Sequence, residues 1–135
     1  MILVDTDVVS NLMRTAPSPA LIRRLAAVRP EEQFTSAITV GELTYGAYLS
    51  ARTDTILQRL NERVSRNLTV VPFDRAAAEL YGQLRARLER AGTPLPEPDL
   101  RIAAIALSRS FTLVTGNVRH FGRVPGLTVE NWLAE

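Results

Sequence analysis

The acidic residues that could form a metal site are spread over most of the chain. Asp5 and Asp7 follow the apolar run at residues 2–4, and Glu42 and Asp99 lie near the starts of two amphipathic segments. Carboxylates held close together repel one another, so they need a cation or protons to coexist. Oxygen ligands without cysteine favour Mg²⁺ or Mn²⁺. These acids therefore predict a divalent-cation site, provided that the fold brings them together.

Each acid also has a purely structural interpretation. Thr39 and Glu42 fit the capping box T-x-x-E at a helix start. Asp99 is a good N-cap candidate for the following helix, and Asp5 or Asp7 could cap a short first helix. For Asp7 the capping interpretation is the preferred one. Taken singly, none of these residues identifies a metal site.

The order of elements decides whether the acids can meet. Short apolar runs predict strands, and amphipathic stretches between them predict helices. The strands are expected at 2–4, 33–38, 68–71, 111–114 and 127–129, and the helices at 8–14, 19–28, 39–50, 54–64, 75–91 and 99–107. Residues 115–121 are expected to form a turn or short helix. The pattern predicts a single domain over residues 1–135: a three-layer α/β/α sandwich with a central parallel sheet of about five strands.

A parallel sheet of this kind gathers the acids at one edge. Every crossover helix runs opposite to the strands, so helix N-termini lie at the carboxyl edge of the sheet, where ligands bind. Asp5, Glu42, Asp99 and the turn at 115–117 should therefore face one another. Because helix caps gather at the same edge, this argument leaves the capping interpretation open.

Composition removes several other chemistries. The chain of 135 residues has no cysteine, and all 16 of its basic side chains are arginine, against 14 acids, for a net charge of +2. A thiol nucleophile, a P-loop lysine and a Schiff base are excluded. The single histidine, His120, would have to serve any histidine-based triad. No apolar run approaches a membrane span, and no signal peptide is present, so a cytoplasmic protein is expected.

Four segments resemble, in order, the signatures of a PIN domain of the VapC toxin type. They are residues 2–7, 36–47, 98–106 and the C-terminal stretch 114–132. The resemblance implies a Mg²⁺-dependent ribonuclease, with Mn²⁺ as a substitute. It also implies the toxin of a toxin–antitoxin pair that is held inactive by a VapB-type antitoxin, and a homodimer that assembles further with that antitoxin.

The same resemblance assigns roles to particular residues. Asp5, Asp99 and Glu42 correspond to the metal-binding and catalytic acids. The turn that carries a fourth acid in many PIN domains holds Asn117 and His120 here. This departure favours one tightly bound metal ion, with a second arriving with RNA, and leaves Asn117 to hold a metal-bound water or substrate through its amide.

Substrate contacts are expected around these acids. The hydroxyls of Thr6 and Thr115 could position a metal-bound water or a phosphate. Arg101 and Arg119 lie near the expected edge and could contact RNA. His120 is expected to contact phosphate or line the edge rather than to act as an acid or base.

Three competing interpretations can be weighed against the residues present. Asp5-Thr6-Asp7 also resembles the strand end of a haloacid-dehalogenase-type phosphatase, but that chemistry and that of a receiver domain usually require a lysine, which the chain lacks. A catalytically weak PIN module that binds RNA or a partner is the third. The intact Asp5, Glu42 and Asp99 argue against it, and the missing fourth acid keeps it open.

Overall fold

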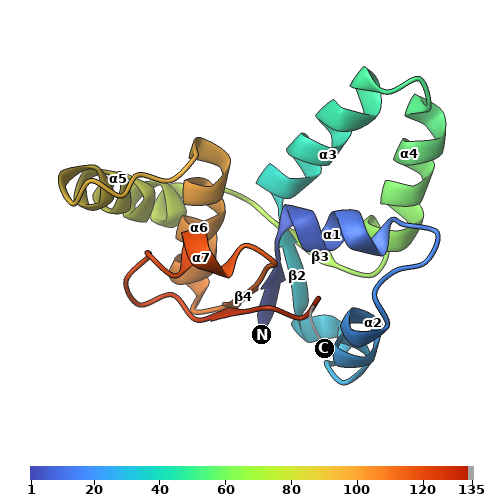
Figure 1. The fold of residues 1–135 in the computed structure, drawn as a ribbon, viewed down its shortest axis with the longest axis horizontal. Coiled ribbons are helices and arrows are strands. Elements are labelled where there is room, and N and C mark those ends of the chain that lie inside the picture. Colours follow the sequence, from blue (N-terminus) through green and yellow to red (C-terminus); the bar gives the residue numbers. More distant parts are fainter. Residues whose placement is uncertain (134–135) are drawn as a thin grey trace.

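Five parallel strands form the centre of the computed structural model, which describes residues 1–133 (Figure 1). The strand order is β3-β2-β1-β4-β5, and each neighbouring pair is parallel. The strands are β1 (Ile2–Val4), β2 (Gln33–Ser36), β3 (Thr69–Val71), β4 (Thr112–Val114) and β5 (Val129–Glu130). The predicted parallel sheet is confirmed.

Seven α-helices connect and flank these strands in the described part of the chain. They are α1 (Thr6–Leu12), α2 (Pro19–Ala26), α3 (Ala37–Leu49), α4 (Thr53–Leu60), α5 (Arg75–Arg90), α6 (Glu97–Arg109) and α7 (Val118–Phe121), with short helical turns at Pro30–Glu32 and Asn61–Ser65. In Figure 1, α3 and α4 run side by side away from the sheet, and α5 lies against α6. None of the helices in residues 1–133 is long and apolar enough to cross a membrane.

Alternation along the short central strands divides the core between the two faces of the sheet. Leu3 of β1 packs with side chains of α5 and α6, whereas Ile2 and Val4 pack with side chains of α1 and α2. In β4, Leu113 joins the first cluster and Val114 the second. Successive strand residues point to opposite faces, so a sheet covered on both faces needs strands that are apolar throughout.

Two predicted helix starts are confirmed by their capping bonds. The Ser18 hydroxyl accepts a hydrogen bond from the backbone amide of Leu21 at 3.4 Å, and Asp74 accepts one from Ala77 at 3.0 Å. Each bond satisfies an amide that has no partner within its helix. Gly92 follows α5 with φ of +74°, a conformation that favours glycine, as expected for a helix end.

Three other helices, α1, α3 and α6, begin two residues earlier than predicted, and α1 begins at Thr6. The chain enters α3 directly after Ser36, whose hydroxyl accepts a hydrogen bond from the Thr39 amide at 3.0 Å. Ser36 is therefore the N-cap in place of Thr39, and the second strand ends at 36 instead of 38. Helix α6 begins at Glu97, so Asp99 lies within its first turn and is not the N-cap.

Candidate metal-binding site

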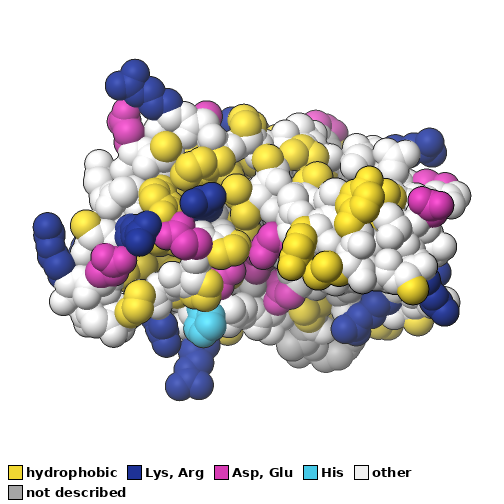
Figure 2. Space-filling model, turned by 90° about the horizontal axis from the view of Figure 1, so that it is seen from above, with side chains coloured by type: hydrophobic (Ala, Val, Ile, Leu, Met, Phe, Trp, Pro, Cys, Tyr) yellow, Lys and Arg dark blue, Asp and Glu magenta, His cyan; other side chains and the backbone are white. Residues whose placement is uncertain are grey.

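The carboxyl edge of the sheet brings Asp5, Glu42 and Asp99 together, as the topology predicts, and Asp7 lies beside them. Asp5 directly follows β1, Asp7 lies in the first turn of α1, Glu42 lies on α3 and Asp99 in the first turn of α6. We call these four residues the carboxylate rim. Figure 2 looks onto this edge and shows acidic side chains gathered near the middle of the face, with the histidine nearby. Asp99 is close enough to Glu42, Asp7 and Asp5 for mutual charge repulsion.

Asp5 is the buried member of the carboxylate rim, with 5% of its surface exposed. Its Oδ2 accepts a hydrogen bond from the Thr115 hydroxyl at 2.8 Å, whereas its Oδ1 is buried without a hydrogen-bond partner in residues 1–133. Burial raises the pKa of Asp5 from 3.8 to about 7, and the nearby charges of Asp7 and Asp99 act in the same direction. The hydroxyl of Thr115 and the backbone N–H of Thr6 oppose this rise in the pKa of Asp5.

This environment fits a bound divalent cation. A buried carboxylate oxygen without a partner is costly, and a nearby cation removes both that cost and the repulsion among the acids. In residues 1–133, no three Asp, Glu, His or Cys side chains are already arranged to hold a metal ion. Mg²⁺ commonly takes only one or two protein carboxylates and keeps several of its waters. The oxygen donors of Asp5, Asp99 and Glu42 suit such an ion.

Asp99 is half-buried and is influenced by neighbours of both signs. Burial chiefly raises the pKa of Asp99, the charges of Glu42 and Asp7 raise it further, and His120 lowers it. The His120 Nδ1 lies 3.9 Å from Asp99 Oδ2. A bound cation would therefore lower the pKa of Asp99 and favour its ionised form, as His120 already does.

A chain of hydroxyl groups positions Glu42. The Ser36 hydroxyl donates to Thr39 Oγ1, and Thr6 Oγ1 lies 3.1 Å from Thr39 Oγ1 and donates to Glu42 Oε1 at 2.7 Å. Because α3 begins at Ala37, Glu42 is in its second turn, so the capping-box interpretation of Glu42 is wrong. The sequence predicts that the Thr6 hydroxyl contacts water or phosphate. In the structure this hydroxyl donates its hydrogen bond to Glu42 instead.

The turn between β4 and α7 is the remaining part of the site. The Asn117 amide N–H donates to Thr115 Oγ1 at 3.0 Å, and the Asn117 side-chain nitrogen lies 2.9 Å from His120 Nδ1. Asp7, on α1, contacts this turn, because its Oδ2 accepts a hydrogen bond from the Gly116 amide at 2.9 Å. The capping interpretation of Asp7 is therefore wrong. Asp5 stands at the N-cap position of α1, but its side chain accepts no capping bond there.

The two arginines expected to contact RNA differ in their surroundings. Arg119 is exposed on α7, directly after the β4–α7 turn. Arg101 is half-exposed on α6, with its Nε 3.4 Å from Glu97 Oε2 and its guanidinium over the rings of Phe73 and Tyr81 at 5.9 and 5.6 Å. Arg119 is the more available of the two for a phosphate.

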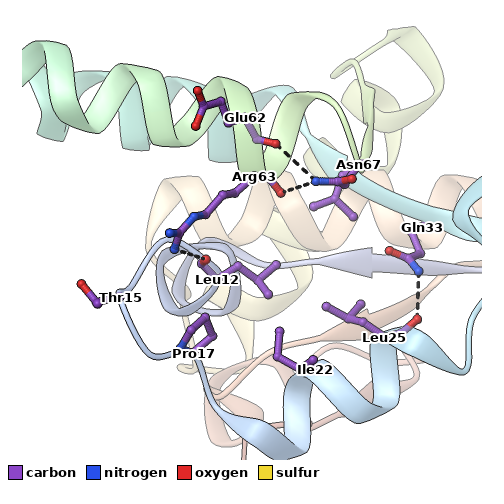
Figure 3. A pocket seen from close by; sticks show the side chains of 10 residues that line it. Leu12, Thr15, Pro17, Ile22, Leu25, Gln33, Glu62, Arg63 and Asn67 are labelled. Carbon is purple, nitrogen blue, oxygen red and sulfur yellow. Dashed lines mark hydrogen bonds between the residues drawn. The ribbon is translucent and has the colours of Figure 1, made fainter.

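Two cavities lie away from the buried part of the site. One of about 410 Å³ is bounded by α2 and by the start of β2, at the opposite edge of the sheet, and none of the predicted site residues lines it (Figure 3). A second, of about 390 Å³, is a largely apolar groove between α1, α3 and α4. Glu42 lines this groove, which therefore reaches the carboxylate rim.

Comparison with known proteins shows the family to which the chain belongs. The sequence profile of the PIN domain matches residues 2–127. The tRNA(fMet)-specific endonuclease VapC of Salmonella typhimurium is 40% identical over 114 residues, which cover 84% of this chain and 86% of the relative. Ribonuclease VapC2 of Haemophilus influenzae is 33% identical, with 97% of each chain covered.

Solved structures give the same result. A chain from the crystal structure of VapBC2 from Rickettsia felis bound to a promoter DNA fragment superposes with a TM-score of 0.89 at 30% identity, covering 98% of this chain and 99% of that one. A chain of DNA-bound VapBC from Salmonella typhimurium gives 0.88 at 36% identity, with the same coverage. The chain belongs to the PIN domain family, within its VapC branch. Membership of this family rules out the phosphatase and receiver-domain interpretations.

Proposed function

We propose that this protein is a divalent-metal-dependent ribonuclease and the toxin of a VapBC-type pair. The observation that carries the proposal is the buried, unpartnered Oδ1 of Asp5 beside the partly buried Asp99 and Glu42. The names of its relatives, endonuclease and ribonuclease VapC, support RNA as the substrate. Mg²⁺ is the proposed physiological ion, and Mn²⁺ should replace it, because the donors are carboxylate oxygens.

The residues of the site divide the work of phosphodiester hydrolysis. Asp5 and Asp99 hold the ion, which when bound neutralises charge on the scissile phosphate and activates water. Glu42, oriented by Thr6, binds the ion through water or orients the attacking water. Thr115 fixes Asp5 and, through the same Oγ1, accepts a hydrogen bond from the backbone N–H of Asn117. The side-chain amide of Asn117 would hold a metal-bound water or substrate. Because Asn117 adds no charge, we propose one resident ion, with a second arriving with RNA.

Contacts to RNA come from the exposed part of the same edge. Arg119 lies on α7 beside the turn and supplies positive charge to a phosphate, with a smaller contribution from Arg101, which already faces Glu97. His120 lies between Asn117 and Asp99 and contacts phosphate there. Exposed single-stranded segments are the proposed targets, because only their backbones can reach a recessed site freely.

The experiment that tests this proposal is RNA cleavage by the purified protein after EDTA treatment and after return of Mg²⁺ or Mn²⁺. Cleavage should disappear with EDTA and return with either ion, and a phosphomonoester should stay intact. Binding of RNA without cleavage in any metal would overturn the nuclease and leave the catalytically weak PIN module. Glu42→Gln serves as the control that the activity arises at this site.

The groove between α1, α3 and α4 suits the inhibitory partner. We propose that a VapB-type antitoxin places an apolar segment in this groove and a cationic side chain at the carboxylate rim, where Glu42 lines both. A charge-assisted bond contributes about 1.5–3 kcal/mol, so the apolar segment supplies most of the affinity. An antitoxin without that cation should bind more weakly, by roughly 10–150-fold, and should inhibit less even when it saturates the protein. Full inhibition at saturation would show purely steric blockade.

We further propose a homodimer, since α3 exposes three large side chains of apolar character. Tyr45, Tyr48 and Leu49 are 67%, 67% and 70% exposed. A two-fold axis beside α3 would bury these side chains in both copies.

The protein is proposed to work as a single PIN domain, in the cytoplasm, where RNA and a co-expressed antitoxin meet.

A further inference from the structure

We propose that Asp7 is a positioning residue of the carboxylate rim. Its carboxylate holds the β4–α7 turn through the Gly116 amide, and the turn in that position fixes Asp5 through Thr115. The inference concerns a residue outside the set of proposed metal ligands and catalytic groups. It rests on the proposed function only for the consequence in RNA cleavage.

The hydrogen bonds of the turn form two parallel anchors. The Gly116 N–H donates to Asp7 Oδ2 at 2.9 Å, and the next amide, of Asn117, donates to Thr115 Oγ1 at 3.0 Å. Thr115 has one hydroxyl proton, which goes to Asp5 Oδ2 at 2.8 Å, because Asp7 Oδ1 lies farther away at 3.5 Å. Asp7 therefore acts on Asp5 through the backbone of the turn.

Gly116 shows how closely the two parts fit. A Cβ placed there would lie 2.7 Å from Asp7 Oδ2 and 3.0 Å from Leu133 Cδ1. Gly116 is not among the residues with positive φ, so its backbone conformation is open to other residue types. An alanine at position 116 would push the Asp7 carboxylate away from the amide, because the added methyl group would occupy the place of Asp7 Oδ2.

The anchored turn decides which oxygen of Asp5 faces the cation site. With Thr115 in place, Oδ2 is taken by a hydrogen bond and Oδ1 is left without a partner. A turn released from Asp7 would let the Thr115 hydroxyl move, and Asp5 would lose its fixed orientation. Such outer contacts typically change metal affinity or activity by roughly 10–100-fold. Because Asp7 is exposed, the lower end of this range is expected.

The alternative role for Asp7 is direct attraction of the cation by its charge. The two roles separate in Asp7→Asn, which keeps an oxygen acceptor of the same shape for the Gly116 amide and removes the charge. Asp7→Ala removes both. Asp54→Ala is the matched control, because Asp54 is an exposed acid in the first turn of another helix, α4.

The experiment measures three properties of each variant. They are the amide NMR signal of Gly116 in metal-free protein, the affinity for Mn²⁺, and kcat and KM for RNA. Asp7→Ala should shift the Gly116 signal, weaken Mn²⁺ binding and lower kcat by about tenfold with little change in KM. Asp7→Asn should stay within about threefold of wild type, and Asp54→Ala should match wild type.

A double-mutant cycle with Gly116→Ala tests the contact itself. Gly116→Ala should lower Mn²⁺ affinity by as much as Asp7→Ala, and adding it to Asp7→Ala should cost less than about twofold more, because the two residues share one interaction. Gly82→Ala is the control for the added methyl group, since a Cβ at Gly82 meets nothing within 4 Å.

Two results would overturn the inference. An Asp7→Asn variant as impaired as Asp7→Ala would show that the charge is what matters. An unchanged Gly116 signal in Asp7→Ala would show that the bond is absent. If the wild-type protein cuts no RNA, the proposed function fails, but the NMR signal and Mn²⁺ affinity still decide the role of Asp7.

Discussion

The hydroxyl of Thr115 donates a 2.8 Å hydrogen bond to Asp5 Oδ2, joining residues that are 110 positions apart in the sequence. Thr115 is fully buried, and the neighbouring Asp5 Oδ1 is buried without a partner. The pairing follows from the sheet, because β1 and β4 are parallel neighbours in register from Ile2 with Thr112 to Val4 with Val114. The two residues after these strands therefore meet at the carboxyl edge.

The first prediction concerns this bond. Thr115→Val keeps the shape of the side chain and removes its proton, so Asp5 loses its fixed orientation. Metal affinity and RNA cleavage should fall by roughly 10–100-fold. Titration with Mn²⁺ and single-turnover cleavage measure the two effects. Thr115→Ser, which restores the hydroxyl, should recover most of both, and failure of that recovery would count against the role of the bond.

The second prediction is a pH dependence of stability. Burial raises the pKa of Asp5 to about 7 in the folded protein, above its ordinary value of 3.8. The folded chain therefore holds this proton more tightly than the unfolded chain. The stability that results is fully present below the ordinary pKa and is lost as the pH rises through about 7.

Thermal unfolding in EDTA measures this effect. The Tm of wild type should fall relative to that of Asp5→Asn as the pH rises from about 4 to about 7, and the difference should level off above that, because the variant lacks the titrating group. Added Mg²⁺ should reduce the difference at the higher pH by stabilising the ionised form of Asp5. A difference in Tm that does not vary with pH would show that Asp5 ionises normally.

The third prediction separates the activity of Asp99 from its contribution to stability. Asp99→Asn should abolish RNA cleavage and leave the Tm unchanged or higher, because it relieves the repulsion from Glu42 and Asp7. Cleavage assays and circular dichroism measure the two. Asp74→Ala is an instructive comparison, because Asp74 caps α5 and loss of that cap should lower stability without affecting the chemistry. Wild-type cleavage by Asp99→Asn would refute the metal mechanism.

The fourth prediction compares the two arginines. Arg119→Ala should weaken RNA binding several-fold and reduce the salt dependence of binding by about one phosphate contact. Arg101→Ala should have the smaller effect on binding, because Arg101 already interacts with Glu97 and two aromatic rings. Binding titrations at several salt concentrations measure both variants. A larger salt effect for Arg101→Ala would reverse the assignment.

The fifth prediction concerns assembly through α3. Wild-type protein should scatter light as a dimer of roughly twice the 14.9 kDa chain mass at micromolar concentration. Tyr45→Ser with Leu49→Ser should shift it to the monomer, since both side chains are exposed in the single chain. Ile22→Ser, at an exposed apolar residue on α2, provides the control. A monomeric wild type without antitoxin would contradict the prediction.

The fold and the convergence of the acids could be predicted because both follow from short-range patterns. The apolar run before Asp5 defines a buried strand, and the alternation of strands and helices requires parallel connections. The placement of Glu42 and Asp99 at the edge then needs only the direction of the helices. Errors at the starts of α3 and α6 left this result intact, because a shift of two or three residues keeps each acid at the same end of its helix.

The hydrogen-bond partners of the acids could not be predicted in the same way. Ser36 and Thr39 both fit an N-cap, and the apolar Ala37 and Ile38 between them also fit a strand. The partner of Asp7 is a backbone amide 109 residues away, and an acid near a helix start looks like a cap whatever it contacts. The spacing Asp5-x-Asp7 after a strand, together with the glycine in the turn after the fourth strand, was the available signal.

An anomalous difference map from crystals containing Mn²⁺ tests most directly whether the carboxylate rim holds the ion used for RNA cleavage. We expect a peak within bonding distance of Asp5 Oδ1 that is also bound by Asp99, directly or through water, and no such peak in crystals of Asp5→Asn. A map in which Mn²⁺ lies away from Asp5 and Asp99, in protein that cuts RNA with Mn²⁺, would contradict it.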